Sequence, residues 1–458
     1  MSIFAKCVRP GEQIQHYDYS FLLLGGTGVG KSTFINTLLN IVLESNIISL
    51  KIAAKSKVYP NISPEFNDGL IENANESSMD SQTAHSHFYL VCGKVTNFKT
   101  VLIIDTPGLS ATGGISDDDK NTNEIMVAAL RVDKISAILF LEKFSENRAT
   151  PQFIYNVYRI SNVIPQVFEN SVFMILTFDC DGEKDIQASA YPFNIQEAFL
   201  INNSAFRCDA RLAENDKKKK LEKSLMKSRI KIQKIFETIF KRDSQNTIQY
   251  NEMFIHYNNI MKSIANYMNH LNNFEMIKSN INNPNMQFVT KRWEEVKYHS
   301  TMCVRHEKIC HQDCALNFTN CAGSNYFENC ACMNVEKICC KCGCTSAYHY
   351  HDFKILVEEK TELKKILSEY LLDELSAKNY DILIRKINEK ESEIIKDLIH
   401  SECQIHRINP RYHLSKYFSI AENYISNGIY ASKGKKIKEE LEADINLYKK
   451  IQASLRNS

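Results

Sequence analysis

The sequence has no dominant charge, no long apolar run and few prolines. Its 56 Lys and Arg nearly balance its 54 Asp and Glu, and a net charge of +2 argues against the whole molecule being a binder of polyanions. No window approaches the ~18 continuous apolar residues that a membrane span needs. The first residues lack the charged-then-apolar pattern of a secretory signal, and the last residues carry no lipidation motif. We therefore expect a cytoplasmic protein without a transmembrane segment.

The composition is otherwise that of a soluble globular chain. Apolar residues make up 44% and charged residues 24%, and a length of 458 residues suits about two to four domains. No proline falls between Pro284 and Pro410, and because proline breaks helices, this tract suits helices on either side of a metal-binding segment.

Four segments differ in pattern. Residues 1–208 alternate strand-like and helix-like runs, which is typical of an α/β domain. We predict a basic helical region over 209–298, a Cys/His-rich segment over 299–352, and a charged helical region typical of a coiled coil over 353–458. In the first segment the expected strands are Phe21–Leu24, Phe88–Cys92, Val101–Asp105, Ala137–Leu141 and Val172–Thr177, and the expected helices are Thr33–Leu43, Asn123–Val132 and Pro151–Ile160. A short turn between the second and third strands makes them an antiparallel pair.

The helical pattern over Leu221–Ile239 is basic. Between Ala205 and Gln245 there are 13 Lys and Arg against 6 Asp and Glu. Such a helix could contact anionic lipid or nucleic acid, but we favour a solvated helix face and do not expect nucleic acid among the partners.

The stretch Gly25-Gly26-Thr27-Gly28-Val29-Gly30-Lys31-Ser32 fits the P-loop pattern GxxxxGK[ST]. An apolar strand precedes it and a helical pattern from Thr33 follows it, which is the context that the motif requires. Glycines let backbone N–H groups point at phosphate oxygens, and the helix N-terminus adds a partial positive charge. We expect Lys31 to reach the β- and γ-phosphates and Ser32 to coordinate Mg²⁺. All nine residues from Gly25 to Thr33 are candidate nucleotide contacts.

A second motif, Asp105-Thr106-Pro107-Gly108, ends the apolar strand VLIID. Asp105 sits where a carboxylate can hold Mg²⁺, and the Gly108 N–H would face a γ-phosphate. Nucleotide kinases do not need this motif, whereas switch GTPases do, because loss of the γ-phosphate contact releases the segment. A GTPase also needs a hydroxyl that closes over Mg²⁺, and we choose Thr83 for this role, with Ser81 as the alternative. The predicted catalytic residues are therefore Lys31 and Thr83.

Base recognition should follow the strand Val172–Thr177, which continues Phe178-Asp179-Cys180-Asp181. A guanine-specific site uses a carboxylate here to accept two N–H bonds from the edge of the ring. The usual [NT]KxD pattern lacks its lysine, and either Asp181, which we favour, or Asp179 would supply the carboxylate. Leu109 follows DTPG where Ras-like enzymes carry a water-orienting glutamine, so we expect slow intrinsic hydrolysis that rises on self-association or with a partner.

With GGTGVGKST, SQT, DTPG and TFDCDG in this order, residues 1–208 resemble the immunity-associated nucleotide-binding GTPases of the avirulence-induced-gene type, which are related to septins and to chloroplast import receptors. The resemblance implies an α/β P-loop G domain, with a mostly parallel sheet and one antiparallel strand, that binds GTP or GDP with Mg²⁺ and forms a homodimer across its nucleotide face. Phe178 departs from the family, which carries Arg or Lys there, and no hydrophobic C-terminal anchor is visible. Residues 209–458 are similar to uncharacterised lower-eukaryote G-domain proteins, from which no function carries over.

Cysteine is unevenly distributed, since 10 of the 15 lie between Cys303 and Cys344. The 14 candidate metal ligands in this segment are Cys303, His306, Cys310, His311, Cys314, Cys321, Cys330, Cys332, Cys339, Cys340, Cys342, Cys344, His349 and His351. Zinc takes four S or N ligands in a tetrahedron, and ligand pairs a few residues apart let one turn supply two of them. The pairs of this kind are Cys310 with Cys314, Cys339 with Cys342, and His349 with His351.

We favour structural Zn²⁺ over disulfides and over an Fe–S cluster, because no secretory signal is present and the spacing fits neither ferredoxin pattern. The ligands are enough for two sites or three, and not every cysteine need bind. The favoured ligands are Cys310, His311, Cys314, Cys330, Cys332, Cys339, Cys342, Cys344, His349 and His351.

Three functions fit these patterns. The first is a GTP-binding switch whose helical, zinc-bearing arm binds a protein partner of unknown identity. The second is an ATP-dependent P-loop enzyme, which the incomplete base motif allows. The third is a zinc-organised interaction scaffold in which the nucleotide is structural.

Overall fold

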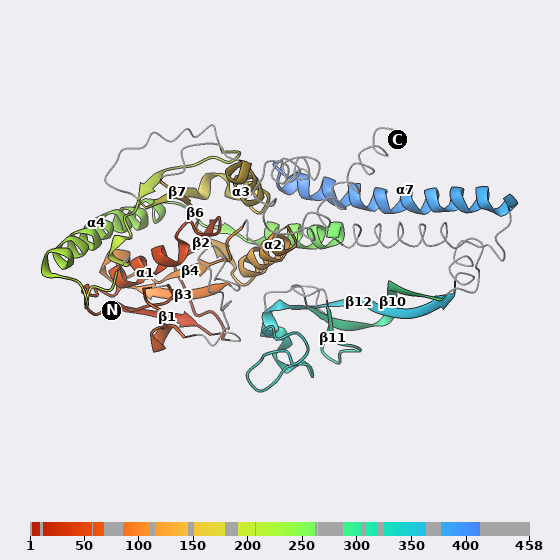
Figure 1. The fold of residues 1–458 in the computed structure, drawn as a ribbon, viewed down its shortest axis with the longest axis horizontal. Helices are drawn as coiled ribbons and strands as arrows, with labels where there is room; N and C mark the ends of the chain where they lie inside the picture. Colours follow the sequence, from red (N-terminus) through yellow and green to blue (C-terminus); the bar gives the residue numbers. More distant parts are fainter. Residues whose placement is uncertain are drawn as a thin grey trace.

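The chain forms a sheet with helices on both faces, and a ribbon-shaped arm extends from one side of it (Figure 1). The computed structural model describes residues 2–9, 12–56, 58–67, 86–109, 115–144, 151–178, 191–206, 208–261, 263, 287–303, 308–318, 325–362 and 377–412.

The central sheet has seven strands in the order β1-β3-β4-β2-β6-β7-β8. They are β1 (Phe4–Val8), β2 (Tyr19–Gly25), β3 (His87–Cys92), β4 (Val101–Asp105), β6 (Ala137–Lys143), β7 (Val172–Thr177) and β8 (Ala198–Leu200). Within this sheet β3 runs against the other strands, because it pairs antiparallel with both β1 and β4. The predicted mostly parallel sheet with one antiparallel strand is therefore confirmed. The sequence patterns did not indicate β1 and β8.

The remaining elements surround this sheet or build the arm. The helices include α1 (Lys31–Val42), α2 (Ile115–Leu130), α3 (Pro151–Asn162), α4 (Asn215–Ile239), a helix over 248–261, and α7 (Ala377–Ile408). The 3-10 turns include η1 (Pro64–Phe66), η2 (Lys94–Thr96), η3 (Gln166–Ser171), η5 (Ser204–Phe206), η6 (Asn325–Asn329) and η7 (Ser346–Tyr348). The other strands are β5 (Lys134–Ile135), β9 (Gln245–Asn246), β10 (Gln287–Cys303), β11 (Lys308–His311) and β12 (His349–Glu362).

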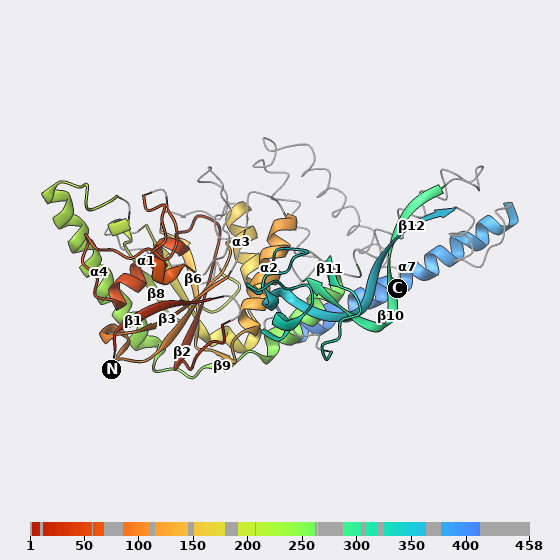
Figure 2. The ribbon, with the colours of Figure 1, turned by 90° about the horizontal axis from the view of Figure 1, so that it is seen from below.

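Strand β2 is apolar on both sides because helices cover both faces of the sheet. Alternate side chains of a strand point to opposite faces. Phe21 and Leu23 belong to a core shared with α1 and α4, whereas Leu22 and Leu24 belong to a core shared with α2 and α3 (Figure 2). All four side chains are fully buried. This two-sided burial explains why the strand is a continuous apolar run and does not alternate.

Helix α4 confirms the helical spacing predicted for the basic region. Its apolar positions, Leu221, Leu225, Ile232, Ile235, Phe236 and Ile239, are all buried. At its end, the rings of Phe21 and Phe236 stack with centroids 5.5 Å apart. Lys217, Lys219 and Lys220 are exposed, as expected for a solvated helix face.

The arm is a three-stranded ribbon of order β11-β10-β12, and here the prediction of helix is wrong. Residues 287–298 and 353–362 are strands, not helices. The register places Lys291 opposite Glu358 and Glu295 opposite Lys354. The two paired segments lie far apart in the chain, so reading each strand alone does not reveal this pairing.

The arm and α7 are packed onto the face of the sheet that carries α2 and α3. Cysteines of the arm, Tyr348, and Leu398 of α7 share one continuous core with α2. After the end of α7, Asn409 Nδ2 donates to the Ser161 carbonyl at 2.8 Å, and Arg411 Nη2 donates to the Ile164 carbonyl at 2.8 Å. The predicted coiled coil stays a prediction.

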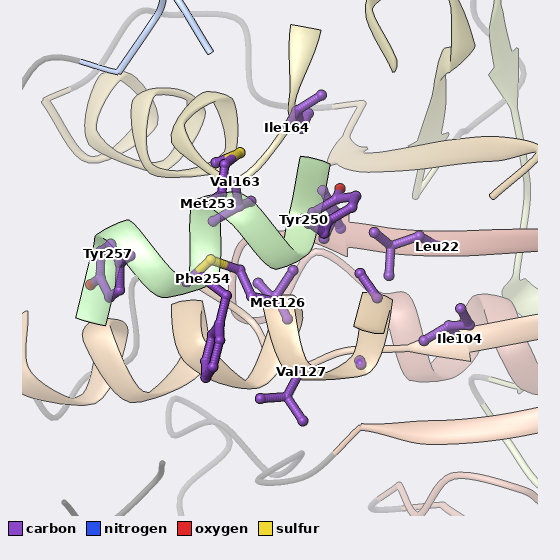
Figure 3. Close-up of a cluster of buried hydrophobic side chains, with 14 of the residues drawn as sticks. Leu22, Ile104, Met126, Val127, Val163, Ile164, Tyr250, Met253, Phe254 and Tyr257 are labelled. Atoms are coloured by element: carbon purple, nitrogen blue, oxygen red, sulfur yellow. The ribbon is translucent and has the colours of Figure 1, made fainter. Parts of the chain in front are cut away.

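The helix over 248–261 fills the space between α2 and the end of α3 (Figure 3). Figure 3 shows Phe254 of this helix toward Met126 and Val127 of α2, and Met253 beside Val163 at the end of α3, all of them buried. Among the described residues no helix is both long and apolar enough to cross a membrane.

Candidate functional site

The P-loop lies where the sequence predicts it, between the end of β2 and the start of α1. Gly28 and Gly30 have φ angles of +77° and +93°, in the left-handed region that favours glycine. A Cβ on Gly28 would meet only the Lys143 Nζ, at 4.0 Å, so this side of the loop is open. The α1 N-terminus follows immediately, and its N–H groups can therefore receive an anion.

Lys31 points back into the loop that precedes it. Its Nζ donates to the carbonyl oxygens of Gly25 at 3.0 Å and Gly26 at 3.1 Å, and its side chain is buried. Burial lowers the pKa of Lys31 to about 8, although the nearby Asp105 and Glu142 carboxylates oppose this shift. A buried ammonium attracts a phosphate more strongly than an exposed one does, because the surroundings screen the charge less.

The DTPG segment touches the P-loop through its backbone. A Cβ on Gly108 would lie 2.7 Å from Thr27 Oγ1 and 2.8 Å from Thr27 Cα, so this approach requires glycine. The Thr27 N–H donates to the Leu109 carbonyl at 2.9 Å, and the Leu109 N–H donates to the Gly25 carbonyl at 3.3 Å. Binding of a phosphate at the Thr27 N–H would therefore affect the position of Leu109.

The residues at this edge fit a magnesium–nucleotide complex. Because β2 and β4 are parallel neighbours, Asp105 and the P-loop lie at the same edge of the sheet. The Thr27 hydroxyl oxygen is buried in the loop and makes no hydrogen bond among the described residues. Ser32 and Asp105 offer the hard oxygen ligands that Mg²⁺ requires, and Lys31 offers a cation for phosphate.

Two residues of this site were not singled out from the sequence. Thr177 closes β7 against the P-loop, since its Oγ1 donates to the Val29 carbonyl at 2.5 Å. Glu142, at the end of β6, is a buried carboxylate within electrostatic reach of Lys31. Both lie at the carboxyl ends of parallel strands, which is the only signal that could have found them.

Phe178 occupies the place next to the P-loop where the usual base motif has its lysine. Its φ is +60°, an uncommon conformation for an aromatic residue, and such strain concentrates at functional sites. The Cε2 atom of Phe178 lies 3.4 Å from the position of a Cβ on Gly30. The side chain is 40% exposed, so a flat apolar surface faces outward beside the P-loop.

Some predicted site residues lie outside the described residues. They are Thr83 and its alternative Ser81, and Asp181 and its alternative Asp179. Among the arm candidates, His306 and Cys321 lie outside them as well.

The arm brings most of the predicted metal ligands into two groups. In the first group, the ligand atoms of Cys310, Cys339, Cys342 and His349 all lie within 4.8 Å of one another, as do those of Cys303, Cys342 and Cys344. In the second group, His311, Cys314 and Cys330 lie within the same distance of one another. Cys332 lies between the two groups, because its Sγ is 3.5 Å from that of Cys330 and also within hydrogen-bonding reach of Cys339.

One predicted ligand pairing is wrong, because Cys310 and Cys314 lie in different groups. Cys310 and His311 are neighbours on β11, so their side chains point to opposite faces of the ribbon, and Cys314 follows the face of His311. The pair Cys339 and Cys342 stays together. His351 is buried against the Phe327 ring at 4.7 Å, and the close groups do not include it.

Glu124 of α2 connects the arm to the nucleotide side of the sheet. Its Oε1 accepts the Tyr348 hydroxyl from the arm and the Ser86 N–H, the latter at 2.7 Å. Ser86 directly follows the segment 68–85, which contains Thr83. One turn earlier in α2, Asn121 Nδ2 donates to the Gly108 carbonyl at 2.9 Å.

Residues 20–176 match the family described as 50S ribosome-binding GTPase. No curated protein matches the chain in sequence. Solved structures that resemble it include Toc33 from Arabidopsis thaliana with GDP and Mg²⁺, which is 18% identical with a TM-score of 0.30 and covers 48% of this chain and 82% of that chain. Toc33 from the same plant with Mg²⁺ and GMPPNP is 17% identical with a TM-score of 0.30 and covers 49% and 86%. A bacterial selenocysteine-specific elongation factor is 15% identical with a TM-score of 0.23 and covers 46% and 28%.

The family match ends within β7, before α4 and the arm. Together with the P-loop, the DTPG contact and the sheet order, it identifies residues 20–176 as a P-loop GTPase domain that binds GTP.

Proposed function

We propose that the chain is a GTP-binding switch with slow intrinsic hydrolysis, and that its arm responds to the nucleotide through α2. The observation that carries this proposal is the position of Glu124, which accepts hydrogen bonds from Tyr348 of the arm and from Ser86. A single buried carboxylate of α2, the helix after DTPG, thus joins Ser86 to the arm.

The hydrogen bonds of α2 suggest how the response travels. The Gly108 N–H is where a γ-phosphate would be sensed, and the Gly108 carbonyl is bonded to Asn121. A displacement of Gly108 is passed to the first turns of α2, and Glu124 lies one turn further along. Movement of α2 then changes the hydrogen bond to Tyr348, which directly precedes the proposed metal ligand His349 in the arm.

The proposal of slow hydrolysis rests on Leu109. Its side chain is fully buried, and its backbone extends the pairing with the P-loop at Gly26. No polar side chain at this position can orient a water molecule toward the phosphate. We infer that turnover rises when a second copy or a partner supplies the missing group, which is the behaviour implied by the resemblance to the avirulence-induced-gene GTPases.

The base site is proposed to use Phe178 as a stacking surface and Asp181, or Asp179, as the guanine-selecting carboxylate. The exposed ring beside Gly30 supports the first part, because aromatic rings stack on bases of any identity. We also propose that the chain forms a homodimer across its nucleotide face and that it is located in the cytoplasm. The protein partner is left unnamed.

The arm is proposed to be stabilised by Zn²⁺, since the two groups of thiols and imidazoles have the ligand types and closeness that zinc requires. The described cysteines form no disulfide. For the ion of the second group we propose His311, Cys314, Cys330 and Cys332 as the four ligands.

The test is competition of GTP and ATP for the purified, metal-replete chain, with its mass measured in GDP and in a non-hydrolysable GTP analogue. Preference for GTP and a larger mass with the analogue are the expected results. If ATP displaces GTP at equal concentration, the second candidate, an ATP-dependent P-loop enzyme, replaces the switch. If GTP binds but the mass never changes, the dimer is wrong and the GTP site stands.

A further inference from the structure

The first ligand group of the arm holds more ligands than one zinc ion can use. It comprises the six residues Cys303, Cys310, Cys339, Cys342, Cys344 and His349, of which Cys342 belongs to both close sets. A tetrahedral ion takes four ligands, so a single ion would leave two buried thiols beside it with no role. Two ions need eight coordination positions, and six side chains can fill these only if two of them bind both ions.

We propose that this group holds two Zn²⁺ ions bridged by the thiolates of Cys310 and Cys342. Cys342 is within ligand distance of every other member in one set or the other. Cys310 lies within hydrogen-bonding reach of both Cys303 and Cys342, so it touches the second set as well as its own. The first ion then takes Cys310, Cys339, Cys342 and His349. The second ion takes the two bridges together with Cys303 and Cys344.

The chemistry of the side chains decides which of them can bridge. A thiolate sulfur has several lone pairs and can bind two ions, whereas each imidazole nitrogen has one lone pair and binds one. His349 must therefore be a terminal ligand. Its Nδ1 is bonded to the Thr345 carbonyl at 2.9 Å, which leaves Nε2, 3.4 Å from Cys342 Sγ, to face the metal. A metal-bound histidine usually donates its other nitrogen to such a carbonyl, and this fixes the ring.

The backbone around the thiols suits a compact cluster. Cys303 at the end of β10 lies directly opposite His349 at the start of β12. The loop between the ligands turns tightly, with Gly343 at φ +76° and the Cys339 N–H donating to the Cys344 carbonyl at 2.7 Å. The Lys341 N–H also points at Cys339 Sγ, at 3.4 Å, which helps to stabilise a thiolate.

Charge balance favours two ions over one. Cys303, Cys310, Cys339 and Cys344 are all buried, and a buried charge needs compensation. Five thiolates with two Zn²⁺ carry a net charge of about −1, whereas five thiolates with one Zn²⁺ would carry a net charge of about −3. With the separate ion at His311, Cys314, Cys330 and Cys332, the arm holds three.

The inference rests on the proposed zinc-binding arm, and its test separates the two. Zinc bound to the purified full-length chain is counted by elemental analysis, with Cys340→Ser as the matched control, because Cys340 is exposed beside the buried Cys339. We expect three ions in the wild type and in Cys340→Ser, two in Cys344→Ser, and one in Cys342→Ser.

The second measurement uses the wild-type chain loaded with ¹¹³Cd, so that it does not depend on whether a variant folds. Three resonances are expected, two of which split each other through the bridging sulfurs. Two ions per chain and no cadmium–cadmium splitting would overturn the bridged pair while leaving a metal-binding arm. A chain that binds no zinc would overturn the zinc-binding arm itself.

Discussion

The contact between Tyr348 and Glu124 is the most informative single hydrogen bond to remove. Tyr348→Phe deletes one hydroxyl and keeps the ring, which is buried in the core shared by the arm and α2. Glu124 is also buried and keeps its bond to the Ser86 N–H, so the carboxylate loses the Tyr348 donor alone.

The expected effect follows from the class of this bond. A hydrogen bond to a buried charged group contributes about 1.5–3 kcal/mol, and each 1.4 kcal/mol is a factor of about ten in an equilibrium. Detachment of the arm from α2 should therefore become about 10- to 150-fold more frequent. Amide hydrogen exchange of residues 344–350 and of α2 measures this directly, as faster exchange under conditions where opening is an equilibrium.

Tyr326→Phe is the matched control. Its hydroxyl donates to the Asn317 carbonyl at 2.8 Å within the arm and the side chain is partly exposed, so exchange in α2 should not change. The double variant with Glu124→Gln should show a smaller loss than the sum of the two single losses, because the residues act through one contact. Unchanged exchange in Tyr348→Phe would refute the claim that this bond couples the arm to α2.

Three further predictions concern the nucleotide site. The pKa of Lys31 is about 8, and its charged form binds phosphate, so nucleotide affinity should fall about tenfold from pH 7 to pH 9. Calorimetry in two buffers at about pH 8.5 should show that the protein takes up a proton when the nucleotide binds. An affinity that does not change with pH would contradict this prediction. Phe178→Ala should lower the affinity for a fluorescent GDP analogue by about 5- to 150-fold, because one stacked base contributes ~1–3 kcal/mol. The melting temperature should not change, since the Phe178 side chain is 40% exposed. An unchanged Kd would exclude stacking of the base on this ring. Leu109→Gln should not accelerate single-turnover hydrolysis, because the side chain at this position is fully buried. It should lower the free energy of unfolding by about 1–3 kcal/mol, because a polar amide is then buried. A tenfold faster turnover would show that this residue faces the phosphate.

The G domain could be predicted from the sequence because its signals are local. The strands Val101–Asp105 and Val172–Thr177 have the predicted bounds, and α1 begins at Lys31, close to the predicted start at Thr33. Each of these assignments depends on a pattern a few residues long. The edge strand Phe4–Val8 carries no comparable pattern, and its pairing with β3 depends on a partner 80 to 88 residues away.

The arm was predicted less well because its structure depends on residues that are distant in sequence. The sequence of β10 or of β12, read alone, predicts a charged helix. The two segments form strands because they pair with each other. Adjacent Cys310 and His311 join different ligand groups because β11 is a strand, which a search for ligand spacing cannot reveal. The contact of Tyr348 with Glu124 spans 224 residues, and neither residue belongs to a motif.

The central claim is that the arm responds to the nucleotide bound by the GTPase domain. The most direct test is amide hydrogen exchange of residues 344–350 in the full-length, zinc-replete chain, compared between GDP and a non-hydrolysable GTP analogue. We predict that exchange differs between the two nucleotides, and that the difference disappears in Tyr348→Phe. Identical exchange in both nucleotides, with both shown to be bound, would contradict the account.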